Sequence, residues 1–462
     1  MTDASTRSLP AWLVLAVATI LLLAGTVAFA IDARLGVALL VAPVVVAVVL
    51  SPPAGAALLF FLLPLEELAA FTGGMVTKLF GVAVVAGWLL HALLWREPIG
   101  APVIGVPVAA FVFWAALSVL WAVDQSVSLH MLLTYVQLLG LYLLVVNVLR
   151  TPGALRHALY AHVAGGVVLA VFGLCLTWEG VLQRGRTAIV VDQQLLMEPN
   201  AFAAALILPV VVCLTTTTDV RRGGFERFAL ALAGAVCLTT ILLTMSRGAI
   251  VAIAVSAIAV SVARGQLLLP VLGLLLAAPG LLLAPPEFWQ RWSEGATLAD
   301  RGAGRLDIWS VGWVVVRQYP LLGVGLGCFP VVYYTFLSQA TGISWKHAEH
   351  VAHVLEKYPH NIYLGAAAEL GIPGFLLLVA VLAVHLWVAR ATWRLLRAAG
   401  HPGADLALAI AAGLLALVVQ GGAFDIAHRK YLWAVLGLAA IGRGLVPSSS
   451  AATEAVPLRR AA

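Results

Sequence analysis

The feature that most constrains this chain is the recurrence of apolar runs long enough to cross a membrane. About fourteen such runs follow one another. A bilayer offers no water to its backbone groups, so only helices or closed barrels cross it, and these runs are far longer than barrel strands. Hydrophobic residues make up 62% of the chain and charged ones 10%, with a mean hydropathy of +1.03. The sequence therefore predicts an all-α polytopic membrane protein with about 12–14 transmembrane helices, because the short run 54–65 is typical of a re-entrant segment.

One long polar interruption divides these runs into two groups. We expect an N-terminal transmembrane bundle over residues 1–284, a large loop over 285–359, C-terminal transmembrane helices over 360–446 and a disordered tail over 447–462. The loop is much longer than the six or so residues of most connections, so we expect function there. Tryptophans recur in it at helical spacing, which is typical of short helices at the level of the lipid headgroups. They are Trp289, Trp292, Trp309 and Trp313.

The distribution of arginine and lysine predicts the orientation. If the N-terminus is cytoplasmic, the short loops on its side hold about twice as many of these residues as those on the other side. This bias predicts that both termini are cytoplasmic and that the large loop lies on the opposite face.

Several arginines lie on the face of the large loop, where the positive-inside rule predicts few arginines and lysines. They include Arg184, Arg186, Arg247 and Arg305. Arg247 has a structural alternative, which is to extend toward lipid headgroups, and Arg305 has another, which is to pair with Asp300 or Asp307. Because a guanidinium fork matches phosphate oxygens in pairs, we interpret the group as a binding site for an anion such as a lipid-linked phosphate.

His360 stands where the large loop returns to the membrane, between Pro359 and Asn361. Proline suits the first turn of a helix, so we expect the imidazole at a helix N-terminus. The positive end of the helix dipole disfavours imidazolium and leaves a neutral ring that accepts a proton. A lone histidine at an interface is more often structural, but its place beside the arginine-rich face favours a functional role.

A metal site is not expected. His347, His350 and His353 recur at a spacing of three, but neither HExxH nor CxxC accompanies them. We interpret them as a solvated helix face or a surface that contacts glycan. The four cysteines have no paired spacing, so neither a disulfide framework nor zinc is indicated.

These motifs together resemble the O-antigen ligase and O-antigen polymerase superfamily of bacterial envelope glycan assembly. The matching features are SRGA around Arg247, GRLDIW around Arg305, the large loop, and HNIYLGAAAELGIPG from His360. In the last of these, His360, Asn361, Gly371 and Gly374 fit a pattern of histidine, asparagine and glycine-x-x-glycine. The resemblance covers roughly residues 197 to 425, and the N-terminal helices match only in kind.

The resemblance implies a membrane glycosyltransferase of the C type (GT-C) in the bacterial inner membrane. It would transfer a glycan from undecaprenyl pyrophosphate to an acceptor hydroxyl at the periplasmic face, without metal or other cofactor. We assign His360 as the base that takes the proton of the hydroxyl, and Arg247 and Arg305 as the groups that stabilise the departing pyrophosphate. The expected substrate-binding residues are Arg184, Arg186, Asn200 and Asn361.

The acceptor is left open by the sequence. Our first expectation is an O-antigen ligase that acts on lipid A-core in lipopolysaccharide biosynthesis. The alternative is a polymerase of O-antigen or exopolysaccharide repeat units, with a lipid-linked glycan as acceptor. An alternative from another class is a transporter of lipid-linked anions, although the scarcity of charges near span centres counts against an ion-coupled one. The sugar, the stereochemical outcome and the oligomeric state also stay open.

Overall fold

The structure is a computed structural model that describes most of the two helical groups. The described residues are 45–66 without 47, 75–179, 182–183, 186–191, 194–219, 221–266, several positions between 273 and 289, 305–341 and 358–442. Seven helices among them are long and apolar enough to cross a membrane, and four shorter apolar helices accompany them. The prediction of an all-α polytopic membrane protein is confirmed. The count of 12–14 spans stays a prediction, because several of the expected runs lie outside the described residues.

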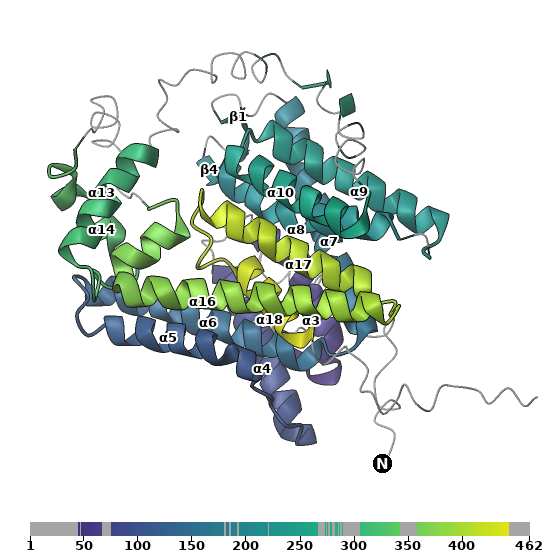
Figure 1. Ribbon diagram of the computed structural model, residues 1–462, viewed down its shortest axis with the longest axis horizontal. Coiled ribbons are helices and arrows are strands. Elements are labelled where there is room, and N and C mark those ends of the chain that lie inside the picture. The colour runs from purple at the N-terminus through teal and green to yellow at the C-terminus, as the bar shows by residue number, and fades with distance from the viewer. Residues whose placement is uncertain are drawn as a thin grey trace, which may run out of the picture.

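Two hairpins of short strands lie among the helices before the large loop in chain order, at the edge of the bundle (Figure 1). The helices are α3 Pro52–Leu62, α4 Met75–Trp95, the 3-10 turn η3 Val103–Gly105, α5 Val106–Ser118, α6 Gln125–Val148, α7 Pro152–Trp178, α8 Pro199–Thr217, α9 Gly224–Leu243 and α10 Arg247–Arg264. The strands are β1 Leu182–Gln183, β2 Arg186–Thr187, β3 Ile189–Val191 and β4 Gln194–Met197. They pair as β1 with β2 and β3 with β4, both antiparallel, in the connection between α7 and α8. The sequence pattern does not predict these strands.

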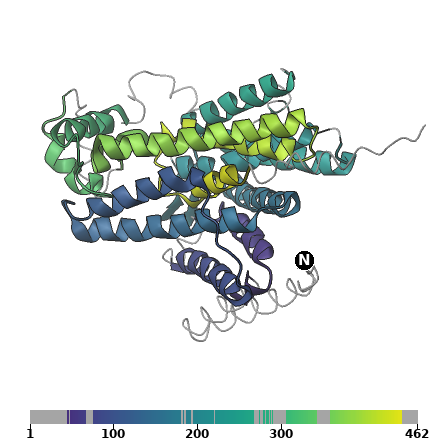
Figure 2. The ribbon, with the colours of Figure 1, turned by 60° about the horizontal axis from the view of Figure 1, so that its bottom comes forward.

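Five helices are described after residue 304. They are α13 Arg305–Gln318, α14 Phe329–Leu337, α16 Ile362–Ala398, α17 Ala404–Gly421 and α18 Lys430–Ile441. Figures 1 and 2 show α13 and α14 together at one end of α16. The stretch from Gly304 to Phe329 holds a single helix, α13, which ends at Gln318 just before Pro320. His347, His350 and His353 lie outside the described residues, as does the tail 447–462, so both predictions about them remain untested.

Two helices form the centre of the bundle. In α8 and α17, 83% of the spanning window is buried inside the protein, against 33–50% in the other candidate spans. Helix α8 packs against α7, α9, α10 and α17. Its alanines, Ala203 to Ala205, are almost completely buried, and small residues of this kind let membrane helices approach closely.

Helix α16 is long and broken. It has 37 residues, and Gly371 interrupts it with φ 70° and ψ −176°, followed by Pro373. At 1.5 Å per residue an unbroken helix of this length would measure roughly 55 Å, more than the ~30 Å of a bilayer core. The short segment before Gly371 therefore has a direction of its own, and it begins at the candidate site.

Candidate active site

Three helix ends come together around residues 360 and 247. A Cβ atom added to Gly421 at the end of α17 would lie 2.5 Å from Cδ1 of Ile362, the first residue of α16. A Cβ atom on Gly248, at the start of α10, would lie 2.7 Å from Cβ of Ala423. Both glycines therefore allow close approach, and the starts of α10 and α16 meet at the end of α17.

Helix α13 is fixed to the same place. The indole nitrogen of Trp309 donates a hydrogen bond of 3.0 Å to the carbonyl oxygen of Pro359, directly before His360. One turn further on, a Cβ atom on Gly312 would lie 2.7 Å from Cδ2 of Leu364. Arg305, the first residue of α13, is thus held beside the segment that carries His360.

The charged groups that act on the guanidinium of Arg305 show which residues lie near it. Burial lowers the pKa of its guanidinium, the charge of Glu198 raises it, and the charge of Arg247 lowers it. An arginine keeps its proton through such shifts. Arg305 and Arg247, predicted from separate motifs, therefore lie within electrostatic range of each other, with Glu198 nearby.

Helix α8 joins the group through a side-chain contact. The hydroxyl of Ser246 donates to Oδ1 of Asn200 at a distance of 3.1 Å. Ser246 is the N-cap of α10 and directly precedes Arg247, and Asn200 is the second residue of α8. Asn200 therefore lies next to Arg247, and its carbonyl oxygen is engaged within the protein.

The helices meet here at their N-terminal ends. Helices α8, α10, α13 and α16 begin at Pro199, Arg247, Arg305 and Ile362, and the contacts above connect these starts. The N-terminus of a helix carries unpaired N–H groups and the positive end of its dipole. Several such ends with two arginines make a region that attracts an anion such as phosphate.

His360 has a strained backbone and a stacked ring. Its φ angle is 48°, and Met245, two residues before Arg247, has φ 52°. Only one other non-glycine residue in the described part has positive φ. Such conformations cost about 1–3 kcal/mol and are enriched at functional sites. The imidazole stacks on Phe424 with 6.1 Å between ring centres and 23° between planes, and Cζ of Arg429 lies 5.9 Å from the same phenylalanine ring.

Pro359 and Asn361 differ from the sequence-based picture. Asn361 is the N-cap of α16, and its Oδ1 accepts hydrogen bonds from the backbone of Tyr363 and Leu364. Pro359 thus precedes the N-cap by two residues, so its predicted place in the first turn is wrong. The expected helix N-terminus does lie next to His360, but Asn361 rather than Pro359 stabilises it, as the N-cap. A substrate contact of Asn361 stays a prediction.

The other two predicted arginines are not placed as side chains. Arg184 lies outside the described residues, and Arg186 is described only as a backbone position in β2, where it pairs with Gln183. Their role in holding the donor stays a prediction.

Sequence reasoning missed several charged residues of this region. Nζ of Lys430, at the start of α18, pairs with the carboxylate of Glu66. The charges of Arg429, Glu66 and Glu198 all act on the buried phenol of Tyr431. The short connection between α17 and α18 gives no signal in the sequence that its cations lie beside residues 198 and 360.

A small cavity lies next to the site. Glu369, Tyr135 and Asp425 contribute to its lining. The carboxylate of Glu369 accepts hydrogen bonds from the backbone N–H groups of Gly327 and Phe329, at 2.9 and 3.3 Å. Glu369 therefore connects α16 to the glycine-containing loop before α14. Within the described residues no cluster of three His, Cys, Asp or Glu is arranged to hold a metal ion.

Fold and site define a multi-pass helical membrane protein with a cationic region where several helices begin. Residues 232–379 match a family model described as O-antigen ligase. The resemblance to the O-antigen ligase superfamily is confirmed over this segment, which includes Arg247, Arg305, His360 and Asn361 but neither Asn200 nor Arg429. No curated protein matches the chain.

Proposed function

We propose that this protein is a membrane glycosyltransferase that moves a glycan from undecaprenyl pyrophosphate to an acceptor hydroxyl at the periplasmic face of the inner membrane. Within that reaction we propose an O-antigen ligase, with lipid A-core as the acceptor. The observation that carries the proposal is the meeting of helix N-termini around Arg247, Arg305 and His360. This combination suits a reaction that releases a pyrophosphate and moves a proton to a base.

Each residue has a defined task in the proposed reaction. The bond between the anomeric carbon and the pyrophosphate oxygen breaks, and the acceptor oxygen forms a bond to that carbon through an oxocarbenium-like state. The electron pair of the broken bond stays on the pyrophosphate, where Arg247 and Arg305 stabilise the growing charge. The proton of the acceptor hydroxyl passes to the imidazole of His360.

The neighbouring residues support these tasks. Asn200 fixes the turn before Arg247 through Ser246. Arg429, against the Phe424 ring, adds a third cation near His360. Arg184, Arg186 and Asn361 are proposed to contact the donor. Because arginines supply the positive charge, we propose that no metal is needed.

The test is a reconstituted reaction with undecaprenyl-pyrophosphate glycan as donor and lipid A-core as acceptor, in EDTA. We expect transfer to lipid A-core. His360→Ala should lower the rate by about 10²- to 10⁴-fold, and Arg247→Ala by about 10²- to 10³-fold, while both variants still insert in the membrane. Wild-type turnover by either variant would remove that residue from the mechanism.

The products also separate the alternatives. Longer lipid-linked chains with lipid A-core unchanged would identify a repeat-unit polymerase. Loss of activity in EDTA that added Mg²⁺ restores would contradict metal independence. The break of α16 at Gly371 is the one observation that favours a transporter, since transporter sites use broken helices. Movement of the lipid-linked donor across the membrane without any transfer would support that function instead.

A further inference from the structure

A second polar region lies at the other end of the bundle. Helix α10 begins at Arg247 and ends at Arg264, so these residues mark opposite ends of a candidate span. Around Arg264 a cavity of about 280 Å³ opens between the end of α10, the end of α16, the start of α17 and the connection from α8 to α9. This cavity is distinct from the candidate active site.

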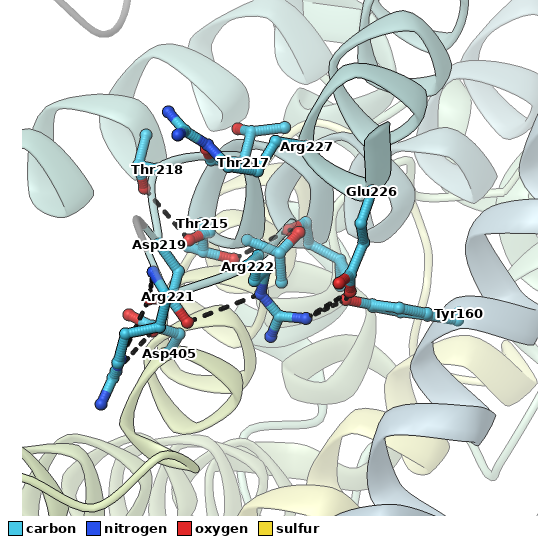
Figure 3. A network of polar contacts seen from close by, with 12 residues as sticks. Tyr160, Thr215, Thr217, Thr218, Asp219, Arg221, Arg222, Glu226, Arg227 and Asp405 are labelled. Atoms are coloured by element: carbon cyan, nitrogen blue, oxygen red, sulfur yellow. Dashed lines mark hydrogen bonds and ion pairs between the residues drawn. The ribbon is translucent and has the colours of Figure 1, made fainter. Parts of the chain in front are cut away.

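Three arginines line this cavity together with one carboxylate, Asp405. Arg221 donates from Nη2 to Asp405 at 3.1 Å and from Nε to Asp219, also at 3.1 Å. Arg264 donates to the other oxygen of Asp405 and to the carbonyl oxygen of Thr215. Arg397 donates to the carbonyl oxygen of Ala263. Figure 3 shows how Arg221 bridges Asp219 and Asp405 from different elements.

The network has more positive than negative charge. Behind the cavity, Arg222 pairs with Asp219 and with Glu226, and Tyr160 donates to the same glutamate (Figure 3). With Arg227, which donates to the carbonyl oxygen of Thr217, five arginines accompany three carboxylates, Asp219, Glu226 and Asp405, so positive charge is in excess. Among the described contacts Nη1 of Arg221 donates to nothing, so it is available to a ligand. A phosphate diester would offset part of this excess charge.

The apolar part of the cavity indicates which phosphate fits. Trp393 and Leu408 form part of its wall, and Cζ of Arg397 lies 5.5 Å from the centre of the Trp393 ring. On the same helix Trp387 and Leu395 are 61% and 54% exposed, as lipid-facing residues are. Tryptophan beside arginine at a helix end is typical of the membrane interface, and basic pockets between helices bind anionic lipid headgroups.

We propose that this cavity binds the phosphate diester of an anionic phospholipid, with Arg221 and Arg397 as its ligands and Trp393 against the glycerol backbone. The site is independent of the proposed transfer reaction. The lipid joins α10, α16 and α17 at the end away from the active site and stabilises the fold.

The test measures the melting temperature of the detergent-solubilised chain. Three additives are compared at equal concentration: short-chain phosphatidylglycerol, short-chain phosphatidylcholine and inorganic phosphate. We expect phosphatidylglycerol alone to raise the melting temperature. An equal rise with phosphatidylcholine would overturn the proposal, because charge would not be recognised. An equal rise with inorganic phosphate would overturn the assignment of a lipid.

Variants locate the binding. Arg397→Gln should weaken phosphatidylglycerol binding about tenfold, as expected for the loss of a charged hydrogen bond. Arg394→Gln, exposed on the same helix and not part of the cavity lining, is the matched control and should bind as the wild type does. Equal loss in both variants would contradict the site.

Arg221→Gln is a second test, which stays valid if the Arg397→Gln variant fails to fold. It leaves Asp405 paired with Arg264 and Asp219 paired with Arg222, so both carboxylates keep a partner. We expect weaker binding of phosphatidylglycerol here as well. Unchanged affinity in Arg221→Gln and Arg397→Gln would overturn the proposal.

Discussion

His360 is fixed by its surroundings in a way that suits a proton acceptor. Its backbone has φ 48°, the carbonyl of the preceding residue accepts from Trp309, and its ring stacks on Phe424. The next residue, Asn361, caps α16. A ring held against an aromatic face next to a capped helix start has little freedom to turn.

The two ends of α13 allow a test of whether Arg305 acts through its planar guanidinium or only through its charge. Arg305 stands at the buried start of the helix and Arg317 on its exposed last turn. Lysine keeps the charge but loses the planar pair of donors. We expect Arg305→Lys to lower the rate of glycan transfer about 10- to 100-fold, the value of one hydrogen bond to a charged group. Arg317→Lys should leave the rate unchanged in the same reconstituted assay. Equal rates for the two variants would show that Arg305 acts only as a charge.

The break in α16 shows how one element depends on its neighbours. Backbone N–H groups of Val324, Gly325 and Ile372 donate across the contact between the loop 320–328 and residues 368–372. Trp114 and Trp121 donate from their indoles to Leu370 and Leu322. A Cβ atom added to Gly371 would lie 2.2 Å from the carbonyl oxygen of Leu321. Gly371 therefore fits the helix to the loop, which explains physically why glycine occupies this position of the motif.

Two glycines with similar φ differ in their ψ angles and in their contacts. Gly371 has φ 70° and ψ −176°, a region that only glycine adopts, with backbone atoms against it. Gly265, at the end of α10, has φ 69° and ψ 28° with nothing within 4 Å. We expect Gly265→Ala to cost about 1 kcal/mol of the free energy of unfolding, and Gly371→Ala about 3 kcal/mol or more. Thermal unfolding in detergent measures both. A similar loss in the two variants would contradict the role given to the contact with Leu321.

For the whole molecule, the sequence predicted the helical membrane fold, while the chemistry assigned to its motifs stays a prediction. Apolar runs predict spans because each helix must satisfy its own backbone in lipid. The positions of Arg247, Arg305 and His360 followed from short motifs and from their excess on one face. The closeness of Arg305 to Arg247 and Glu198, however, depends on packing between segments far apart in the chain. Asn361 was predicted to contact substrate, but its cap on α16 depends on where the helix begins, which composition does not fix to one residue.

Two exposed positions test how the whole molecule lies in the membrane. Ser338 ends α14 on the side of the large loop, and Gly223 precedes α9 beside the network of Arg221 and Asp219. In the proposed orientation, a membrane-impermeant maleimide should label Ser338→Cys in right-side-out vesicles and Gly223→Cys only in inverted ones. The background needs Cys175→Ser, since Cys213, Cys237 and Cys328 are buried and Cys175 is exposed. Labelling in the reverse order would put the Arg247 region in the cytoplasm, where a periplasmic glycan donor does not reach it, and the proposed function would fail with it.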